Sequence, residues 1–271
     1  TPEWFHAAKT KSNGELYSPV HWDWPKPHAR FFAVYPEASI YSKMKIGNTA
    51  STGSPSVEFE IEPDVKKEVD LMTACTGYVH YATQGVHPTT NLDFRHALTG
   101  IRFAVGQNLS WNKIIDKVEL RNVLMKSKYV LSKELDGTGA TWDHTGYSMR
   151  GNATLSGISV STSNNPNVTI MGNAGDNFTF YMIPQELDNK DVELEVAFTD
   201  NTYIKVKLAG KWKAGTTRTY KISQKQSNWD YKLDCTPSVE VPYNGTEATI
   251  RVKSYRKVAN NPSQSVAWKV V

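Results

Sequence analysis

The residues best placed for side-chain chemistry are a histidine and an aspartate two positions apart. On a β-strand, His21 and Asp23 would share one face, and an imidazole beside a carboxylate is a familiar general base. No nucleophile motif accompanies this pair, because the sequence has no Gly-x-Ser-x-Gly elbow and no glycine-rich phosphate loop. The pair alone therefore does not indicate a hydrolase.

Metal sites and acid–base sites also lack a signature. The 7 histidines include no His-x-x-x-His pair, and the sequence has no Cys-x-x-Cys, so zinc-binding patterns are missing. The acidic residues Glu58, Glu60 and Glu62, like Glu193 and Glu195, alternate with apolar residues and are typical of solvated strand faces. We predict no catalytic residue, no metal ligand and no cofactor, with a hydrolase that uses two distant carboxylates as an alternative.

Three isolated residues carry reactive groups. Cys75 and Cys235 are far apart in the sequence, and a disulfide framework needs more thiols at closer spacing. We expect two buried free thiols, with one long-range disulfide as the alternative in an oxidising compartment. We expect His96 to make a hydrogen bond inside a sheet rather than to bind a ligand.

The chain is rich in aromatic residues, with 8 Trp and 13 Tyr. Most such rings serve as core or interface anchors. Exposed indole rings can also stack on sugars, and four tryptophans near loops or strand ends are candidates for that role: Trp22, Trp24, Trp142 and Trp229. A structure that buries them would argue against carbohydrate binding.

The elements that must position these residues are β-strands, because apolar and polar residues alternate along much of the chain. Alternation turns one set of side chains inward and the other toward water, which is typical of half-buried antiparallel strands. It occurs at residues 57–62, 101–105, 118–121, 178–182, 192–198, 204–208 and 248–252. Turn residues separate these runs, and Asn244-Gly245 predicts a hairpin. Only residues 110–115 suggest a short helix, so the predicted fold class is all-β, built from sandwiches.

Composition bounds the class of protein. Of the 271 residues, 39% are apolar and 21% are charged, which excludes a disordered tail, a collagen and a coiled coil. The net charge of +4 comes from scattered basic residues, so we predict no nucleic-acid partner. No apolar run reaches the roughly 18–20 residues of a membrane helix. Residues 1–3 do not resemble a signal peptide, so we expect any export signal to lie outside this chain.

The length predicts two domains and part of a third, at about 100–200 residues per domain. We place them at 1–155, 156–225 and 226–271. The first boundary rests on a Gly/Ser/Asn-rich stretch at 151–167, which is predicted as a linker or long loop, and the second on the polar stretch 224–230.

A series of segments, taken together, resembles one protein family. They are FFAVYP at 31–36, DLMTA at 70–74, LDFRHALTGIRF at 92–103, VELRNV at 118–123, TFYMIPQ at 179–185, WKAGT at 212–216 and TYKIS at 219–223. Their order and spacing resemble the fimbrillin-like (Mfa-like) family, the type V pilus and adhesin proteins of Gram-negative anaerobes. The tail, at 231–233 and 254–256, resembles the start of an Ig-like or BACON-like module.

The resemblance implies a fold and a function. The fold is two transthyretin-like Greek-key β-sandwich domains with a short C-terminal β-segment. The function is that of a non-catalytic fimbrial subunit or adhesin, exported as a lipoprotein to the cell surface, the outer membrane or the fimbrium. Expected partners are other pilus subunits, joined by strand exchange at open sheet edges, and a host or bacterial surface ligand. Because Cys75 is internal, we expect the lipid anchor to lie outside this chain.

The resemblance also implies proteolytic processing, since a protease removes an N-terminal strand in the family. That strand would lie near residues 16–24, and the basic residues around it include Lys9 and Lys11. Lys26 is followed by a proline, which hinders trypsin-like cleavage. Arg30 is followed by Phe31 and is chemically better suited, so Arg30 and Lys26 are the predicted sites. The alternative function is a carbohydrate-binding surface lipoprotein that uses the tryptophans named above.

Overall fold

The computed structural model describes residues 8–18, 28–47, 54–80, 89–106, 109, 113–162, 168–223, 230–235, 252–257 and 264–265. The architecture is all-β, as predicted: apart from the short 3-10 helix η1 (Val65–Lys67), the regular elements of these residues are strands. In this part of the chain, none of the helical structure is long and apolar enough to cross a membrane.

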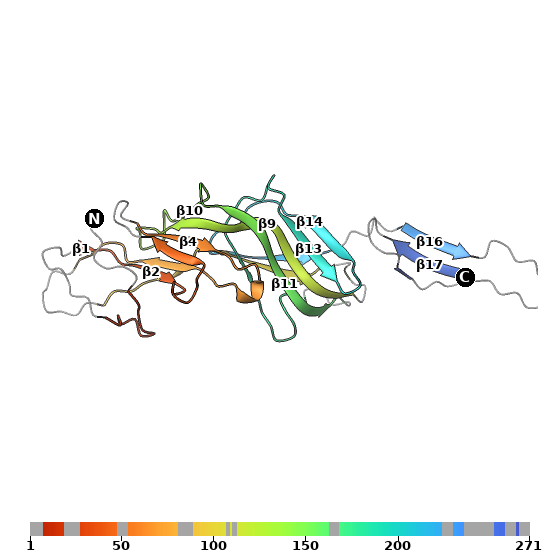
Figure 1. The fold of residues 1–271 in the computed structure, drawn as a ribbon, viewed down its shortest axis with the longest axis horizontal. Helices are drawn as coiled ribbons and strands as arrows, with labels where there is room; N and C mark the ends of the chain where they lie inside the picture. The colour runs from red at the N-terminus through yellow and green to blue at the C-terminus, as the bar shows by residue number, and fades with distance from the viewer. Residues whose placement is uncertain are drawn as a thin grey trace, which may run out of the picture.

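One long strand, β9 (Ile114–Val130), organises a seven-stranded sheet (Figure 1). On one edge it pairs antiparallel with β11 (Met149–Ser161) and then β10 (Thr141–Asp143). On the other edge it pairs with β13 (Glu193–Phe198) and then β4 (Ser56–Glu60). The outermost strands are β14 (Tyr203–Lys207), beside β13, and β3 (Met44–Gly47), beside β4. The strand β9 is therefore common to both halves of the sheet.

A β-bulge in β9 changes which residues face inward. Leu120 pairs with Ala153 and Val123 pairs with Gly151, so two residues of β9 stand opposite one residue of β11. Asn122 lies in the bulge with a positive φ of 56°. Since the extra residue resets the alternation, both Leu120 and Val123 point into the core, and each is fully buried.

Two smaller sheets form the second layer. The first contains β12 (Phe180–Met182), β8 (Thr99–Val105) and β15 (Thr217–Ile222), with β15 parallel to β8. The second contains β2 (Phe32–Tyr35), β5 (Met72–Cys75) and β7 (Arg95–His96). Buried side chains of β8, β12 and β15 join those of the seven-stranded sheet in one hydrophobic cluster, and Phe32 and Val34 of β2 pack against it, so the body is a two-layered sandwich.

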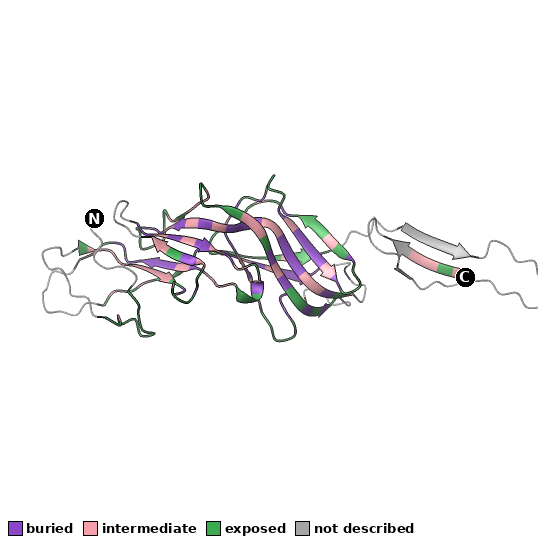
Figure 2. Cartoon of the chain, viewed as in Figure 1, coloured by how far each residue is buried: buried purple, intermediate pink, exposed green. Residues whose placement is uncertain are grey.

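Aromatic rings fill the core between β8, β12 and β15. Phe103 meets Phe180 edge to face, with ring centroids 5.4 Å apart, and stacks on Tyr220 at 5.9 Å. Trp212 is completely buried, and its indole Nε1–H donates to Tyr220 Oη at 2.9 Å. Figure 2 shows buried and half-buried stretches along β9 and β13; in β9 they alternate residue by residue only after the bulge, from Met125 to Val130.

Two further sheets lie at the ends of the molecule. The two-residue strands β1 (His28–Ala29) and β6 (Val79–His80) pair antiparallel. Near the other end of the described chain, β16 (Asp230–Cys235), β17 (Val252–Lys257) and β18 (Gln264–Ser265) form a small sheet that lies apart from the body (Figure 1). The predicted turn at Asn244-Gly245 lies outside the described residues.

Two local predictions were wrong. The stretch predicted as a linker is strand β11 up to Ser161, because its small residues still pair with β9. A helix was predicted for residues 110–115, but its last two residues, Ile114 and Ile115, begin strand β9. The predicted domain boundary between residues 155 and 156 falls inside β11, and the three-part division stays a prediction.

Candidate functional site

Arg30, a predicted processing residue, is half-buried and lies between β1 and β2. The chain is paired on both sides of it. Ala29 pairs with Val79, and the Phe31 amide donates to Thr76 Oγ1 at 3.0 Å. The Thr76 amide donates in return to the Phe31 carbonyl, also at 3.0 Å. The peptide bond after Arg30 therefore belongs to an antiparallel pairing that runs from β1 into β2.

Two contacts that involve side-chain rings lie at the β1–β6 pair. The guanidinium carbon of Arg30 lies 4.0 Å from the centroid of the Tyr78 ring, a favourable position for a cation. Beside it, His28 and His80 stand opposite each other and stack with centroids 4.4 Å apart. The buried Nε of Arg30 has no hydrogen-bond partner.

Sequence reasoning missed Tyr78, His28 and His80 as neighbours of Arg30. The available signal was the segment TGYVH at 76–80, which Cys75 separates from the DLMTA segment at 70–74. At Gly77 the chain takes a positive φ of 63°, which glycine adopts without strain, and this bend separates β5 from β6. Nothing in the sequence pattern pairs this segment with residues 28–32.

A cavity of about 190 Å³ opens beside this region. Its walls include the rings of Tyr129 and Trp142, the charged residues Arg95 and Glu134, and Cys75. It is small compared with typical ligand pockets of roughly 300–1,000 Å³. A mixture of aromatic faces and charged groups suits a small polar molecule with an apolar face.

Trp142 is the candidate sugar-stacking residue that the structure places. It is half-buried, its Nε1–H donates to the Ala97 carbonyl at 2.8 Å, and its ring meets Tyr129 at 5.1 Å. It therefore forms a fixed wall of the cavity. The other candidates, Trp22, Trp24 and Trp229, and the second predicted processing residue, Lys26, lie outside the described residues.

Cys75 is a buried free thiol. Burial raises the pKa of Cys75, and this outweighs both the hydrogen bond that the Gly77 amide donates to Sγ at 3.3 Å and the charge of Arg30. A thiol with a raised pKa is a poor nucleophile at neutral pH. The side chain of Cys235 is outside the described part.

Two half-buried acids, each with a buried carboxylate oxygen, lie where the two smaller sheets meet. Glu68 Oε2 accepts the Tyr181 amide at 2.6 Å, while its buried Oε1 has no partner, and burial raises the pKa of Glu68 well above its ordinary value. Asp70 Oδ2 contacts the His96 imidazole, and the buried Oδ1 has no partner. Burial raises the pKa of Asp70 despite the contact with His96. His96 is thus held by a side-chain contact at a sheet edge.

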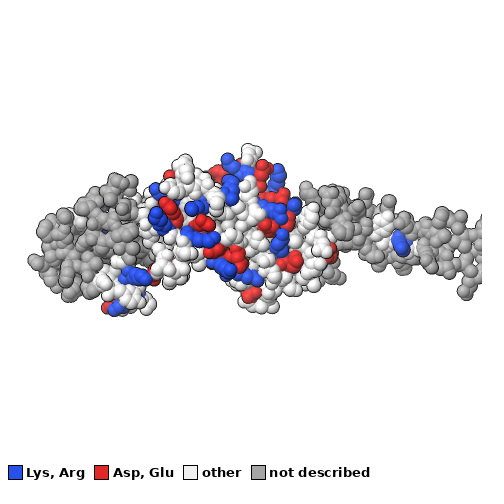
Figure 3. All heavy atoms as spheres, in the orientation of Figure 1, with Lys and Arg blue, Asp and Glu red and all other residues white. Residues whose placement is uncertain are grey.

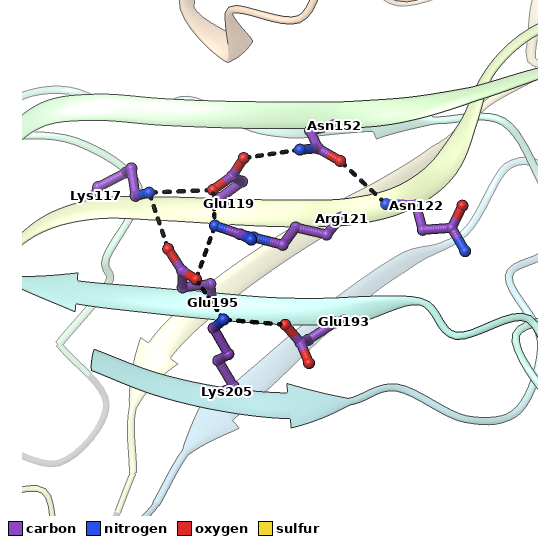
Figure 4. A network of polar contacts seen from close by, with 8 residues as sticks. All are labelled: Lys117, Glu119, Arg121, Asn122, Asn152, Glu193, Glu195 and Lys205. Carbon is purple, nitrogen blue, oxygen red and sulfur yellow. Dashed lines mark hydrogen bonds and ion pairs between the residues drawn. The ribbon is translucent and has the colours of Figure 1, made fainter. Parts of the chain in front are cut away.

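A network of charges covers part of the outer face of the seven-stranded sheet (Figure 4). Lys117 and Arg121 bridge Glu119 and Glu195, and Lys205 extends the network from β14. Glu195 lies on this outer face, as predicted, but it is only 7% exposed, so the prediction that it is solvated was wrong. On the face in Figure 3, basic and acidic side chains are interspersed rather than gathered by sign.

One serine–histidine contact has the residue types of a catalytic pair. Ser127 Oγ lies 2.9 Å from His144 Nδ1 and donates to the Asp143 carbonyl at 2.8 Å. Ser127 is completely buried, so no substrate reaches its hydroxyl in this conformation. Among the described residues, no group of three or more His, Cys, Asp or Glu side chains could hold a metal ion.

Comparison with known protein families shows that the family model described as "Fimbrillin-like" matches residues 6–241. No protein of the curated set matches. A candidate cell adhesion protein of Bacteroides uniformis has 14% identity and a TM-score of 0.42, over 84% of this chain and 72% of that one. A candidate cell adhesion protein of Bacteroides thetaiotaomicron has 11% identity and a TM-score of 0.38, over 78% and 75%. By the match over residues 6–241, the chain belongs to the fimbrillin-like family.

Proposed function

We propose that this chain is a fimbrial subunit or cell-surface adhesin that works without catalysis and joins other subunits by β-strand addition. The observation that carries the proposal is the fimbrillin-like match over residues 6–241, a range that includes both layers of the sandwich. The protein would be displayed at the outer membrane or in a fimbrium as a lipoprotein. Its partners would be other pilus subunits and a host or bacterial surface ligand.

The N-terminal end of the sandwich supports this mode of assembly. Strand addition needs an extended segment whose backbone N–H and C=O groups lack partners. A cut after Arg30 would release β1 and leave β6 (Val79–His80) without its pairing strand. A strand from a second subunit could then take the place of β1.

The edge strand β14 of the seven-stranded sheet is less suited to this pairing. The Phe198 amide donates to the Thr202 carbonyl, and the Leu208 amide donates to the Val192 carbonyl. The even-numbered residues of β14 therefore bond to β13, and the odd-numbered residues turn their N–H and C=O groups toward the free edge. Two of those residues are Lys205 and Lys207. Lysines on an edge strand discourage pairing with another chain, so the N-terminal end is the favoured place for an incoming strand.

Assembly can be tested by comparing the intact chain with a chain that begins at Phe31. We expect the intact chain to stay monomeric in light scattering, and the shortened chain to form concentration-dependent oligomers or filaments in negative-stain microscopy. A folded, shortened chain that stays monomeric at every concentration would refute strand addition at this end.

The second candidate function is carbohydrate binding, which the position of Trp142 in the cavity wall favours. A single sugar ring could place its apolar face on the indole and its hydroxyls toward Arg95 and Glu134. Titration with neutral monosaccharides, followed by tryptophan fluorescence, tests it. Binding that Trp142→Phe weakens would support this function, and no binding at millimolar concentrations would exclude it for those sugars.

A further inference from the structure

The peptide bond after Arg30 is held in a paired segment, although the proposed function requires a protease to cut it. Proteases act preferentially on exposed loop tips and on segments that open from the native structure. In this structure Ala29 is paired before the bond, and the Phe31 amide is bonded to Thr76 after it. Cleavage therefore requires this pairing to open first.

From this geometry we infer that the β1–β6 pair is a latch that controls access to the bond between Arg30 and Phe31. The latch consists of the paired strands β1 and β6, the stacked rings of His28 and His80, and the Arg30 guanidinium over the ring of Tyr78. The inference rests on the proposed function, because it names how cleavage at that site is regulated.

Side-chain contacts must hold the latch, because its backbone pairing is short. The strands β1 and β6 contain two residues each, and Gly77 lies between β5 and β6, where the register shifts between the β1–β6 and β2–β5 pairings. Such short pairing opens easily on its own. The Tyr78 ring is 70% exposed, so it covers Arg30 from the solvent side rather than as part of the core.

Limited digestion of the full chain with trypsin tests the latch, with mass spectrometry following three bonds in one reaction. The bond after Lys11 lies in an exposed turn, the bond after Arg30 is latched, and the bond after Lys117 lies inside β9. In the wild type we expect a cut after Lys11 first, a slower cut after Arg30 and the slowest cut after Lys117.

Variants at Tyr78 separate the ring contact from general effects on folding. Tyr78→Ala should speed the cut after Arg30 by about two- to fivefold, the change expected when an exposed cation–π contact is lost and cleavage follows the open population. Tyr78→Phe keeps the ring and should behave like the wild type. His80→Ala should act in the same direction, with His80→Phe as its matched control.

Several outcomes would overturn the latch. In the wild type, the bond after Arg30 could be cut as fast as the bond after Lys11. In Tyr78→Ala, the rate of cleavage after Arg30 could stay unchanged. In the same variant, cleavage after Lys117 could speed up equally, which would report global unfolding. Hydrogen exchange at the Phe31 amide gives a second readout, and it should quicken in Tyr78→Ala but not in Tyr78→Phe. If the latch behaves as expected while the chain that begins at Phe31 stays monomeric, strand addition at this end fails and the latch stands.

Discussion

Glu119 on β9 and Glu195 on β13 lie directly opposite each other in register, and both are nearly buried. Like charges at opposed positions destabilise a sheet. Here Lys117 Nζ contacts the two carboxylates at 3.1 and 2.9 Å, and Arg121 Nη2 contacts them at 3.0 and 2.8 Å. Two cations thus stand between two acids, and each acid depends on both of them.

Removing one cation should expose the repulsion between the acids. We expect Arg121→Met to lower the free energy of unfolding by roughly 1–3 kcal/mol, because two buried carboxylates then share fewer cations and hydrogen bonds. Adding Glu119→Gln should recover part of the loss. Urea unfolding of the wild type, both single variants and the double variant measures this coupling. Lys221→Met removes an exposed cation from β15 and is the control. If Lys221→Met lowers the free energy of unfolding as much as Arg121→Met does, the charge network does not contribute specifically to stability.

The same network predicts a dependence on pH. Burial raises the pKa of Glu195, but the hydrogen bond from Lys117 and the charges of Lys117 and Arg121 together lower it below its ordinary value. A lowered folded-state pKa contributes stability above the unfolded-state pKa, and this stability is lost as the pH falls through the folded-state value. The difference in stability between wild type and Arg121→Met should be constant from pH 8 to 5 and shrink below about pH 4. A difference that grows in acid would contradict this assignment.

Glu68 should destabilise the protein at neutral pH. Burial raises its pKa well above the ordinary value, so the folded state favours the protonated acid. Stability from such a group is fully present below the unfolded-state pKa and is lost as the pH rises through the folded-state value. Glu68→Gln keeps an oxygen for the Tyr181 amide and should raise the melting temperature at pH 8 by about 2–4 °C, with a smaller gain at pH 5. An equal fall in melting temperature at pH 8 and pH 5 would show that the shape of the Glu68 side chain, and not its charge, affects stability.

The contact between Asp70 and His96 should be needed for the junction of β5 and β7. His96→Ala leaves a mostly buried carboxylate without its partner, and we expect a loss of roughly 1–3 kcal/mol in the free energy of unfolding. Asp70→Asn in the His96→Ala background removes the charge and should reduce the loss. If the double variant is as unstable as the sum of the single variants, the two side chains do not interact.

The bulge at Asn122 offers a test of backbone strain. With φ at 56°, the residue is in the left-handed region, and its Nδ2 donates to the Lys190 carbonyl at 2.7 Å. Asn122→Gly and Asn122→Ala both lose that hydrogen bond. We expect the alanine variant to be less stable than the glycine variant by about 1–2 kcal/mol, since only glycine adopts this conformation freely. Equal stabilities in thermal unfolding would mean that the backbone relaxes.

Alternation alone predicted much of the fold, because the strands that contain Phe59, Phe103 and Val196 each bury one face. The alternation pattern failed where a partner distant in the sequence determines the secondary structure or the burial of a residue. The small residues of β11 form a strand because β9 pairs with them, and the burial of Glu195 depends on cations more than 70 residues earlier in the chain. The bulge in β9 ends the regular alternation, so the prediction there stopped at residue 121.

For the site, the sequence supplied Arg30 as a candidate but not its surroundings. Its neighbour Tyr78 becomes visible only when β1 and β6 are paired, because local patterns do not reveal which segments stand opposite each other. Trp142 was identified from its residue type, while its fixed place in a cavity wall followed from the hydrogen bond to Ala97.

The shared strand β9 has a mechanical consequence. Much of its 17-residue length is paired on both edges, at residues 115–120 and 126–130, so a pull along its axis loads many hydrogen bonds in shear at the same time. The strands on one edge of β9 cannot separate from it one hydrogen bond at a time while the strands on the other edge stay paired with it. Under tension along this strand, the seven-stranded sheet would therefore yield as one cooperative unit, after the small sheets at the two ends have opened.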